Sequence, residues 1–332
     1  MPKTLMVIGA NSFSGQDFVD LALSENEFDK VVGVSRSPER SALFLRYKLN
    51  PRLKDYTYAQ VDLNDDLEKL KQLFDHHQPE AVVNFAAQSE VAPSWEHPED
   101  WFRTNTVSLA GMLKHLSRQK YLKRYLHISS PEVYGTCEGM VREDHPVNPS
   151  TPYAASKASA DLLLSVYLKQ FGFPLLTVRA TNVYGARQQL FKIIPRTSIF
   201  LKLGKTIELH GGGQAVKSYI HIRDVSRGEL AVLRGGNIGE LYHLSPDEGV
   251  AVKDVVRTIC DLQGKAFDSS VKTVDERPGQ DKAYLVDSAK ARKNLGWKPQ
   301  VTMREGLREV SEWVEEYWDQ IVKEPLGYVH KR

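Results

Sequence analysis

Two side chains in the middle of the chain have the types and the spacing of an acid–base pair. Tyr153 and Lys157 stand four positions apart, so on a helix they lie on one face. An ordinary tyrosine has a pKa near ~10, and a nearby lysine cation lowers it by favouring the phenolate. We therefore expect Tyr153 to accept a proton from a substrate hydroxyl, while Lys157 holds the pKa of the phenol down.

A glycine-rich segment near the start of the chain has the pattern of a phosphate-binding turn. It lies between residues 5–8, an apolar run that predicts a buried strand, and residues 14–24, which predict a helix. Glycines let the backbone turn tightly and approach a pyrophosphate, which the first N–H groups of the helix then bind. The pattern Gly-x-x-Ser-x-x-Gly has one glycine fewer than the usual three. We expect these residues to contact a dinucleotide: Gly9, Asn11, Ser12, Phe13, Ser14 and Gly15.

The residues after the second predicted strand indicate which dinucleotide fits. An NAD-selective site has an acid there to bind the ribose hydroxyls, whereas this chain has Ser35 followed by Arg36. A hydroxyl and a guanidinium suit a 2′-phosphate, so NADP is favoured over NAD. A solvated loop arginine would leave the same pattern. Further cofactor contacts are expected from later strand ends and from the acid–base pair: Asp62, Leu63, Phe85, Ala86, Ala87, Tyr153 and Lys157.

The elements that position these residues alternate between strands and helices. Strands are predicted at 5–8, 31–34, 56–61, 81–86, 125–129 and 175–179, and helices at 14–24, 67–77, 104–116, 153–171, 252–262 and 303–318. Such alternation predicts an α/β fold of the Rossmann type, a doubly wound parallel sheet. A smaller C-terminal substrate-binding lobe is expected beside it. We expect an NAD(P)-binding domain over 1–183, with returning segments near 214–245, and a lobe over 184–213 and 246–332.

Composition excludes several classes of partner. Lys and Arg total 44 against 42 Asp and Glu, a net charge of +2, which gives no electrostatic reason to expect nucleic acid or a membrane surface. No apolar run approaches the roughly 20 residues of a membrane span. Two cysteines build no disulfide framework, and the histidines lack metal-ligand spacing. We expect a cytoplasmic enzyme without a metal.

Several motifs, in order along the chain, resemble one known family. They lie at 9–15, 85–88, 129–135, 153–157 and 182–185, and together they look like the nucleotide-sugar epimerase/dehydratase family of extended short-chain dehydrogenases. Residues 86–99 resemble its GDP-mannose 4,6-dehydratases, whereas 277–281 and 295–299 are similar to its dTDP-glucose 4,6-dehydratases. The resemblance covers nearly the whole chain.

The resemblance implies roles for the central residues. Ser130 would bind the oxygen on carbon 4 of a sugar beside Tyr153, with NAD(P) held throughout the cycle. Glu132 would remove the hydrogen on carbon 5, after which water leaves carbon 6 and hydride returns there. Pro131 departs from the dTDP-glucose enzymes, which have an aspartate acid at this position, because proline has no proton to give. Glu132 or a bound water would then supply that proton.

The same resemblance implies the substrate contacts and the assembly. A diphosphate needs local cations, since the protein has little net charge, and Lys217 stands where the family usually has arginine. An exposed loop lysine would leave the same pattern at Lys217. Contacts with a GDP-, dTDP-, CDP- or UDP-hexose are expected from Gln88, Asn105, Asn182, Lys192, Lys217 and Arg277. A homodimer through the helices at 104–116 and 153–171 is expected.

The expected activity is therefore a nucleotide-diphosphosugar 4,6-dehydratase. A nucleotide-sugar 4-epimerase or a uronate decarboxylase shares the oxidation at carbon 4 and stays open as the alternative. A non-catalytic NADP-sensing protein on the same fold is disfavoured, because a sensor has no need of the proton relay of Ser130, Tyr153 and Lys157.

Overall fold

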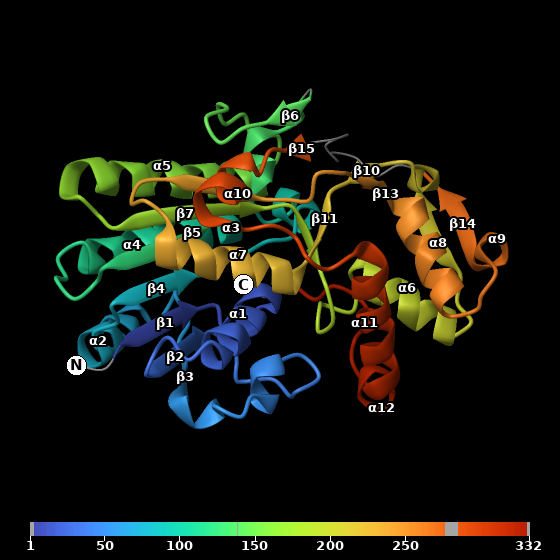
Figure 1. Cartoon of the computed structure of the whole chain (residues 1–332), viewed down its shortest axis with the longest axis horizontal. Coiled ribbons are helices and arrows are strands. Elements are labelled where there is room, and N and C mark those ends of the chain that lie inside the picture. Colours follow the sequence, from blue (N-terminus) through green and yellow to red (C-terminus); the bar gives the residue numbers. More distant parts are fainter. Residues whose placement is uncertain (1–2, 138, 276–284, 331–332) are drawn as a thin grey trace.

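A seven-stranded sheet forms the centre of the protein (Figure 1). The computed structural model describes residues 3–137, 139–275 and 285–330. The strand order is β12-β7-β5-β4-β1-β2-β3, and every neighbouring pair is parallel. The strands are β1 (Thr4–Ile8), β2 (Lys30–Ser35), β3 (Tyr56–Gln60), β4 (Ala81–Asn84), β5 (Arg124–Ile128), β7 (Leu175–Ala180) and β12 (Leu241–Leu244). The predicted Rossmann-type fold is confirmed.

The order of the strands decides where a ligand can bind. β1 pairs with β2 on one side and with β4 on the other, so the order of the chain reverses beside β1. Every residue of β1 is buried, as expected for a strand covered on both faces. Ligands of such sheets bind outside the carboxyl ends of the strands at this reversal.

Helices cover both faces of the sheet. α1 and α7 pack against each other on one face, while α2, α4 and α5 lie on the other. A separate hydrophobic core fills the space on each side, with Phe18 and Leu230 in one and Phe74 and Met112 in the other. The bounds are α1 (Phe13–Ser24), α2 (Leu67–His77), α4 (Ser108–Leu116), α5 (Pro152–Phe171) and α7 (Ile222–Gly235), with α10 (Ala289–Leu295) packed on α7 and β12.

The remaining elements gather beside one end of the sheet, on the right of Figure 1. α6 packs against α8 and α11, and β9 pairs with β14 in parallel. β10 pairs with β13 in antiparallel. The bounds are α6 (Ile193–Lys202), β9 (Ile207–His210), β10 (Val216–Lys217), β13 (Val250–Ala251), α8 (Val252–Leu262), α9 (Phe267–Ser270), β14 (Val271–Val274), α11 (Met303–Glu316) and α12 (Trp318–Ile321). This smaller group carries α6, and Lys192, directly before that helix, pairs with Glu90 of the segment that follows β4.

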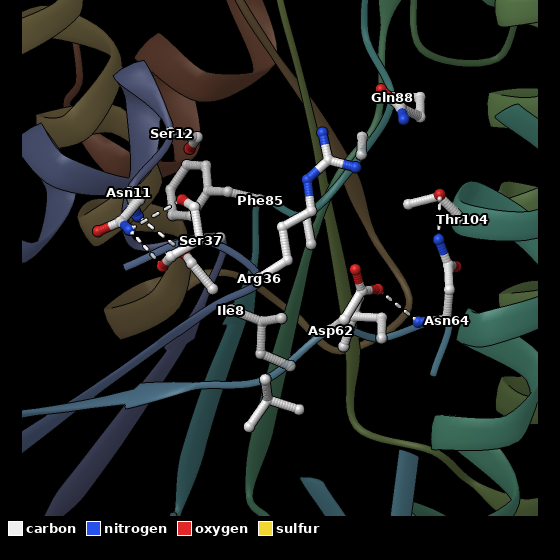
Figure 2. A pocket seen from close by; sticks show the side chains of 16 residues that line it. Ile8, Asn11, Ser12, Arg36, Ser37, Asp62, Asn64, Phe85, Gln88 and Thr104 are labelled. Atoms are coloured by element: carbon white, nitrogen blue, oxygen red, sulfur yellow. Dashed lines mark hydrogen bonds between the residues drawn. The ribbon is translucent and has the colours of Figure 1, made fainter. Parts of the chain in front are cut away.

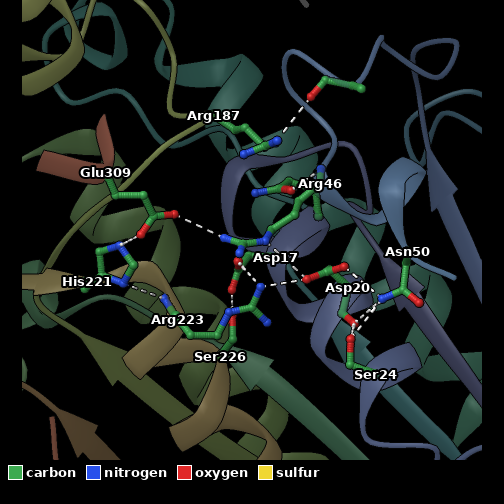
Figure 3. A network of polar contacts seen from close by, with 12 residues as sticks. Asp17, Asp20, Ser24, Arg46, Asn50, Arg187, His221, Arg223, Ser226 and Glu309 are labelled. Atoms are coloured by element: carbon green, nitrogen blue, oxygen red, sulfur yellow. Dashed lines mark hydrogen bonds and ion pairs between the residues drawn. The ribbon is translucent and has the colours of Figure 1, made fainter. Parts of the chain in front are cut away.

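Polar contacts join this group to the sheet domain (Figure 3). Glu309 of α11 binds Arg46 at 3.1 Å and His221 at 3.1 Å. Arg223, in the first turn of α7, forms ion pairs with Asp17 at 3.0 Å and with Asp20 at 2.6 Å, both on α1. Because α1 follows the glycine-rich turn, this network ties the smaller group to the element that starts at that turn.

Short elements connect the larger ones and differ in places from the prediction. The helix predicted at 104–116 begins instead with a π-helical turn, η4 (Arg103–Val107), followed by α4. Two-stranded parallel pairs join β8 (Asn182–Tyr184) to β11 (Tyr219–His221), and β6 (Met140–Val141) to β15 (Leu285–Val286). Among the described residues, no helix has the length and apolar character needed to cross a membrane.

Candidate functional site

A pocket opens at the carboxyl ends of β1, β2 and β4, where the strand order reverses (Figure 2). Its lining includes most of the predicted cofactor contacts: Gly9, Asn11, Ser12, Ser35, Arg36, Asp62, Leu63, Phe85, Ala86 and Ala87, together with Gln88. The sequence prediction missed five further lining residues: Ile8, Ser37, Val61, Asn64 and Thr104. Ile8 ends β1, Ser37 follows β2, and Val61 and Asn64 follow β3, so the position of these four relative to the predicted strands was the available signal.

The glycine-rich turn has the shape that its residue types predict. Gly9 has a φ of +85°, and a Cβ atom there would lie 2.7 Å from the backbone nitrogen of Ala86. At Gly15 a Cβ atom would lie 2.2 Å from the carbonyl oxygen of Gly9. Ser12 caps α1, its Oγ accepting a hydrogen bond from the N–H of Gly15 at 3.0 Å. Both glycines are therefore required, and the serine in place of the middle glycine has a structural role.

Phe13 and Ser14 open α1 directly after this cap. The first N–H groups of that helix have no partner within it, and its N-terminus carries a partial positive charge. The turn thus combines a close backbone approach with donors for an anion, which is the arrangement that a pyrophosphate needs.

The end of β2 is tied to the same turn. The N–H of Asn11 donates to Ser35 Oγ at 2.9 Å, and Asn11 Nδ2 donates to the carbonyl of Ser37 at 3.1 Å. Figure 2 shows the Arg36 side chain extending across the pocket. On the far side, Asp62 Oδ1 accepts a hydrogen bond from the N–H of Asn64 at 2.8 Å. A guanidinium and a carboxylate therefore both border the part of the pocket beyond the turn.

The predicted catalytic residues come from the end of β5 and the start of α5. Thr151 caps α5, with Oγ1 accepting from the N–H of Ala154 at 3.1 Å, and Pro152 begins the helix. Tyr153 and Lys157 follow on its first two turns and are buried, at 8% and 3% exposed. Lys157 Nζ donates to the carbonyl of Ile128, the last residue of β5, at 2.6 Å.

A short 3₁₀ turn, η5 (Pro131–Tyr134), carries the other two candidates. Ser130 caps this turn, and its Oγ accepts from the N–H of Glu132 at 3.3 Å. Pro131 occupies the first position of the turn, where its fixed φ suits the geometry and its missing N–H costs nothing. The proline that departs from the family pattern thus stabilises the turn that presents Glu132, which is half-buried.

The pKa of Tyr153 shifts opposite to the sequence-based expectation. Burial raises the pKa of this phenol, the charge of Glu132 raises it further, and a hydrogen bond with Ser130 opposes the rise. Burial also lowers the pKa of Lys157 to about 8. The expectation of a lowered pKa for Tyr153 is therefore wrong for this structure, because burial, the largest cause, raises it. The Glu132 charge and the hydrogen bond with Ser130 therefore influence this pKa in opposite directions.

Two predicted substrate contacts, Gln88 and Asn105, hold each other. Asn105 Oδ1 accepts from the N–H of Gln88 at 2.9 Å, and Asn105 Nδ2 donates to the Gln88 carbonyl at 3.0 Å and to Ser156 Oγ at 2.9 Å. Asn105 is 4% exposed, and its amide is used within the protein. It fixes the segment after β4 against α5, while Gln88 lines the pocket.

The other predicted substrate contacts lie farther out. Asn182 begins β8 and is half-buried, with Nδ2 donating to the carbonyl of Ser218 at 3.4 Å. Lys192 lies at the start of α6, and its Nζ is 2.8 Å from Glu90 Oε1. Lys217 is half-buried in β10. Arg277 lies outside the described residues.

Sequence reasoning missed several contacts between distant parts of the chain in the region around Lys192, which is called the entrance below. Glu90, in a segment quoted for the resemblance, pairs with Lys192 across 102 positions of the chain. Tyr328 packs edge-on against Phe191, with ring centroids 5.4 Å apart. His330 stacks on Trp101 at 5.5 Å. No local pattern signals these contacts, because each joins segments far apart in the sequence.

Comparisons with known proteins agree with this geometry. A sequence profile of the GDP-mannose 4,6 dehydratase family matches residues 6–310. The chain is 30% identical to a dTDP-glucose 4,6-dehydratase of Haemophilus influenzae, over 93% of this chain and 97% of that one. A dTDP-glucose 4,6-dehydratase of Streptomyces venezuelae, solved with NAD bound, has a TM-score of 0.88 and 29% identity, covering 96% of this chain and 98% of that one. A UDP-glucuronic acid 4-epimerase of Bacillus cereus has a TM-score of 0.83 and 25% identity, covering 94% and 99%. The chain belongs to the GDP-mannose 4,6 dehydratase family.

Proposed function

We propose that the protein is a nucleotide-diphosphosugar 4,6-dehydratase that works with a tightly held NAD(P). One observation carries this proposal: the turn η5, which Ser130 caps, presents the carboxylate of Glu132 at the same site as Tyr153 of α5, and the Glu132 charge raises the pKa of Tyr153. Tyr153 and Ser130 suffice for the proton transfer that accompanies oxidation of a hydroxyl by NAD(P). A second proton-transfer group at the same place suits chemistry at the neighbouring carbon.

The residues at the pocket fit a nicotinamide dinucleotide. The turn at Gly9 and Gly15 leaves no room for a Cβ, so its backbone is open to a pyrophosphate. Tyr153 and Lys157 would meet the nicotinamide ribose. When bound, the oxidised cofactor accepts a hydride and brings a positive charge beside Tyr153, which favours the phenolate. The Streptomyces relative contains NAD, whereas Arg36 in the pocket leads us to propose NADP for this chain.

The chain's own residues would move the protons in three steps. Ser130 would bind the oxygen on carbon 4, and Tyr153 would take the proton of that hydroxyl. Carbon 4 would lose its hydrogen as hydride to the oxidised dinucleotide, and a ketone would form. Glu132 takes the proton from carbon 5, which that ketone acidifies. The hydroxyl on carbon 6 then leaves as water with the proton from Glu132, since Pro131 has none to give. The hydride would then return from the reduced dinucleotide to carbon 6, and carbon 5 would receive a proton that balances the one taken by Tyr153, so the net change is the loss of one water.

The diphosphate would meet cations at the entrance. Lys192 and Lys217, together with Arg277 and Asn182, are the proposed contacts, and Gln88 is proposed for the sugar. Because Lys192 is paired with Glu90, an entering diphosphate would have to displace that carboxylate. We propose the division expected from the sequence, with residues 1–183 and 214–245 binding the dinucleotide and 184–213 and 246–332 the nucleotide sugar.

Incubation with a panel of sugars tests the activity. The purified protein is given NADP or NAD and UDP-, GDP-, CDP- or dTDP-hexoses, and the products are followed by mass spectrometry. Loss of water supports the proposal. An unchanged mass with inverted stereochemistry at carbon 4 would mean a 4-epimerase, which the likeness to the Bacillus epimerase keeps as a second candidate. Loss of carbon dioxide from a uronate would mean a decarboxylase, and no turnover of any donor would contradict an enzyme.

We also propose a homodimer formed through α4 and α5. Apolar side chains stand out from this face, including Leu162 at 61% exposed, Val166 at 58% and Val107 at 65%. Contiguous exposed apolar side chains mark interaction surfaces. The molecular mass in solution, measured by light scattering, should be twice 37.6 kDa and should fall to that of a monomer in a Leu162→Glu/Val166→Glu variant. A wild-type monomer would contradict the dimer.

A further inference from the structure

A buried carboxylate, Asp161, lies one helical turn beyond Lys157 and has no part in the proposed proton transfers. Its side chain is 13% exposed. Oδ2 accepts a hydrogen bond from Ser129 Oγ at 2.6 Å and forms an ion pair with Arg179 Nη2 at 2.7 Å. His127 Nε2 lies 3.4 Å from Oδ1. Asp161 thus joins α5 to the ends of β5 and β7.

These contacts hold the strand end that carries the site. The side chains of residues 127 and 129 reach Asp161, and the carbonyl of the residue between them, Ile128, receives Lys157 Nζ at 2.6 Å. The next residue is Ser130. Three consecutive positions, directly before Ser130, are therefore fixed to the turn of α5 between Lys157 and Asp161. A shift of the Asp161 carboxylate would move Ser130 and Lys157 relative to each other.

Asp161 is the carboxylate that lies against the cations around this turn. Lys157 is 3% exposed and Arg179 is 5% exposed, so two cations are buried near each other. Burial lowers the pKa of His127 to about 4, which leaves that ring neutral near pH 7. Arginine keeps its proton in proteins, so without Asp161 the group that would lose a proton is Lys157. The titratable groups around this turn include His127 from β5, Glu132 and Tyr134 from η5, Tyr153 and Asp161 from α5, Arg179 from β7 and His243 from β12.

We propose that Asp161 is a positioning residue, which keeps Lys157 protonated and aimed at the cofactor's ribose while it holds Ser130 in place. This inference rests on the proposed function, because it names the residue that keeps Lys157 and Ser130 ready for the proposed proton transfers. Asp161 acts through Lys157 and Ser129 and touches no reacting atom.

The direction of the pKa shifts supports this geometry. Burial lowers the pKa of Lys157, Asp161 raises it and Arg179 lowers it, with about 8 as the result. A lysine that must be protonated loses its function as the pH rises through its pKa. Removal of Asp161 should therefore move that loss to lower pH, and removal of Arg179 should move it to higher pH.

The test measures the titration of Lys157 directly, in the full chain labelled with ¹³C at the lysine Cε. The signal that disappears in Lys157→Met belongs to Lys157, and its pKa near 8 separates it from ordinary lysines. We expect its titration to fall by about one pH unit in Asp161→Asn, a tenfold change in proton affinity, and to rise in Arg179→Gln. The alkaline limb of kcat should move in the same two directions.

If Asp161 had only a structural role, Asp161→Asn and Arg179→Gln would not shift the Lys157 titration in opposite directions. Asp254→Asn, an exposed aspartate of α8, is the matched control and should leave the Lys157 titration unchanged. Equal titrations in Asp161→Asn and wild type, or shifts of the same sign in both variants, would overturn the proposal. If Asp161→Asn does not fold, Asp161→Glu moves the carboxylate but keeps its charge, and a Lys157 titration equal to the wild type in that variant would overturn the proposal. The titration needs no turnover, so a wild type that is inactive on every sugar would refute the proposed function and leave this test intact.

Discussion

Lys157 and Lys192 are both proposed to meet the ligands, but the protein holds them in opposite ways. Lys157 is 3% exposed, bound to the Ile128 carbonyl and flanked by the buried Asp161. Lys192 has a side chain 35% exposed and pairs with Glu90, whose side chain is 19% exposed. The first cation is fixed when the chain folds, while the second is held by a contact that a ligand can replace.

This difference predicts which kinetic constant each region controls. Charges in a buried, preorganised site act strongly because water does not screen them, and their geometry needs no rearrangement during the reaction. Half-exposed ion pairs contribute little and exchange partners easily. Changes around Tyr153 and Lys157 should therefore lower kcat, whereas changes around Lys192 should raise KM. A substitution near Lys157 that raises only KM, or one near Lys192 that lowers only kcat, would contradict this division.

The largest effect is expected from Tyr153→Phe, which removes the proton acceptor and keeps the buried ring. The rate of carbon 4 oxidation should fall by about 10²–10⁴-fold, the usual contribution of a positioned acid or base. Single-turnover absorbance of the reduced nicotinamide measures this step. Circular dichroism and the amount of bound cofactor should match the wild type. A rate within tenfold of the wild type would remove Tyr153 from the chemistry.

The second effect separates Glu132 from Tyr153. Glu132→Gln should leave carbon 4 oxidation in place and lower water loss by about 100-fold, because the amide cannot take the carbon 5 proton. Mass spectrometry follows water loss, and exchange of the carbon 5 hydrogen in deuterated water follows proton removal. Asp144→Asn, an exposed acid on the segment after β6, is the control. Unchanged elimination in Glu132→Gln would assign the base to another group.

The two regions also differ in what sequence reasoning could find. Tyr153 and Lys157 belong to one helix, and Gly9 to Gly15 form one turn, so their types and spacing carry the geometry. The pairing of Lys192 with Glu90 depends on how α6 approaches the end of β4, which no local pattern states. Asp161 is an intermediate case. Its spacing of four from Lys157 is visible in the sequence, whereas its partner Arg179 lies far along the chain on β7.

The fold was predictable for the same reason, and its local departures were not. Alternating strands and helices define the parallel sheet, and α2 (Leu67–His77) and α8 (Val252–Leu262) begin and end as predicted. The π-helical turn η4 replaces the predicted start of a helix where Asn105 bonds Gln88 and Ser156. Burial also reversed the expected shift of the Tyr153 pKa, and burial depends on the whole fold.

A smaller effect is expected at the entrance. Lys192→Ala should raise KM for the nucleotide sugar by about tenfold, the order of one charge-assisted contact, and change kcat little. Glu90→Gln should lower KM, because it removes the carboxylate that competes for Lys192. Steady-state kinetics of both variants tests the pair. A fall in kcat with unchanged KM in Lys192→Ala would place this lysine with the buried group.

The smallest effect is expected at Arg36, which is half-buried at the edge of the cofactor pocket. Arg36→Gln keeps a polar side chain but removes the charge proposed to bind a 2′-phosphate. Affinity for NADP should fall by about threefold to tenfold, because a partly hydrated contact with a charge is worth about 1 kcal/mol. Affinity for NAD should stay the same. Calorimetric titration of cofactor-free protein measures both constants, and Ser37→Ala at the same strand end is the control. Equal losses for the two cofactors would mean that Arg36 supports the pocket without reading the phosphate, and NAD would become the proposed cofactor.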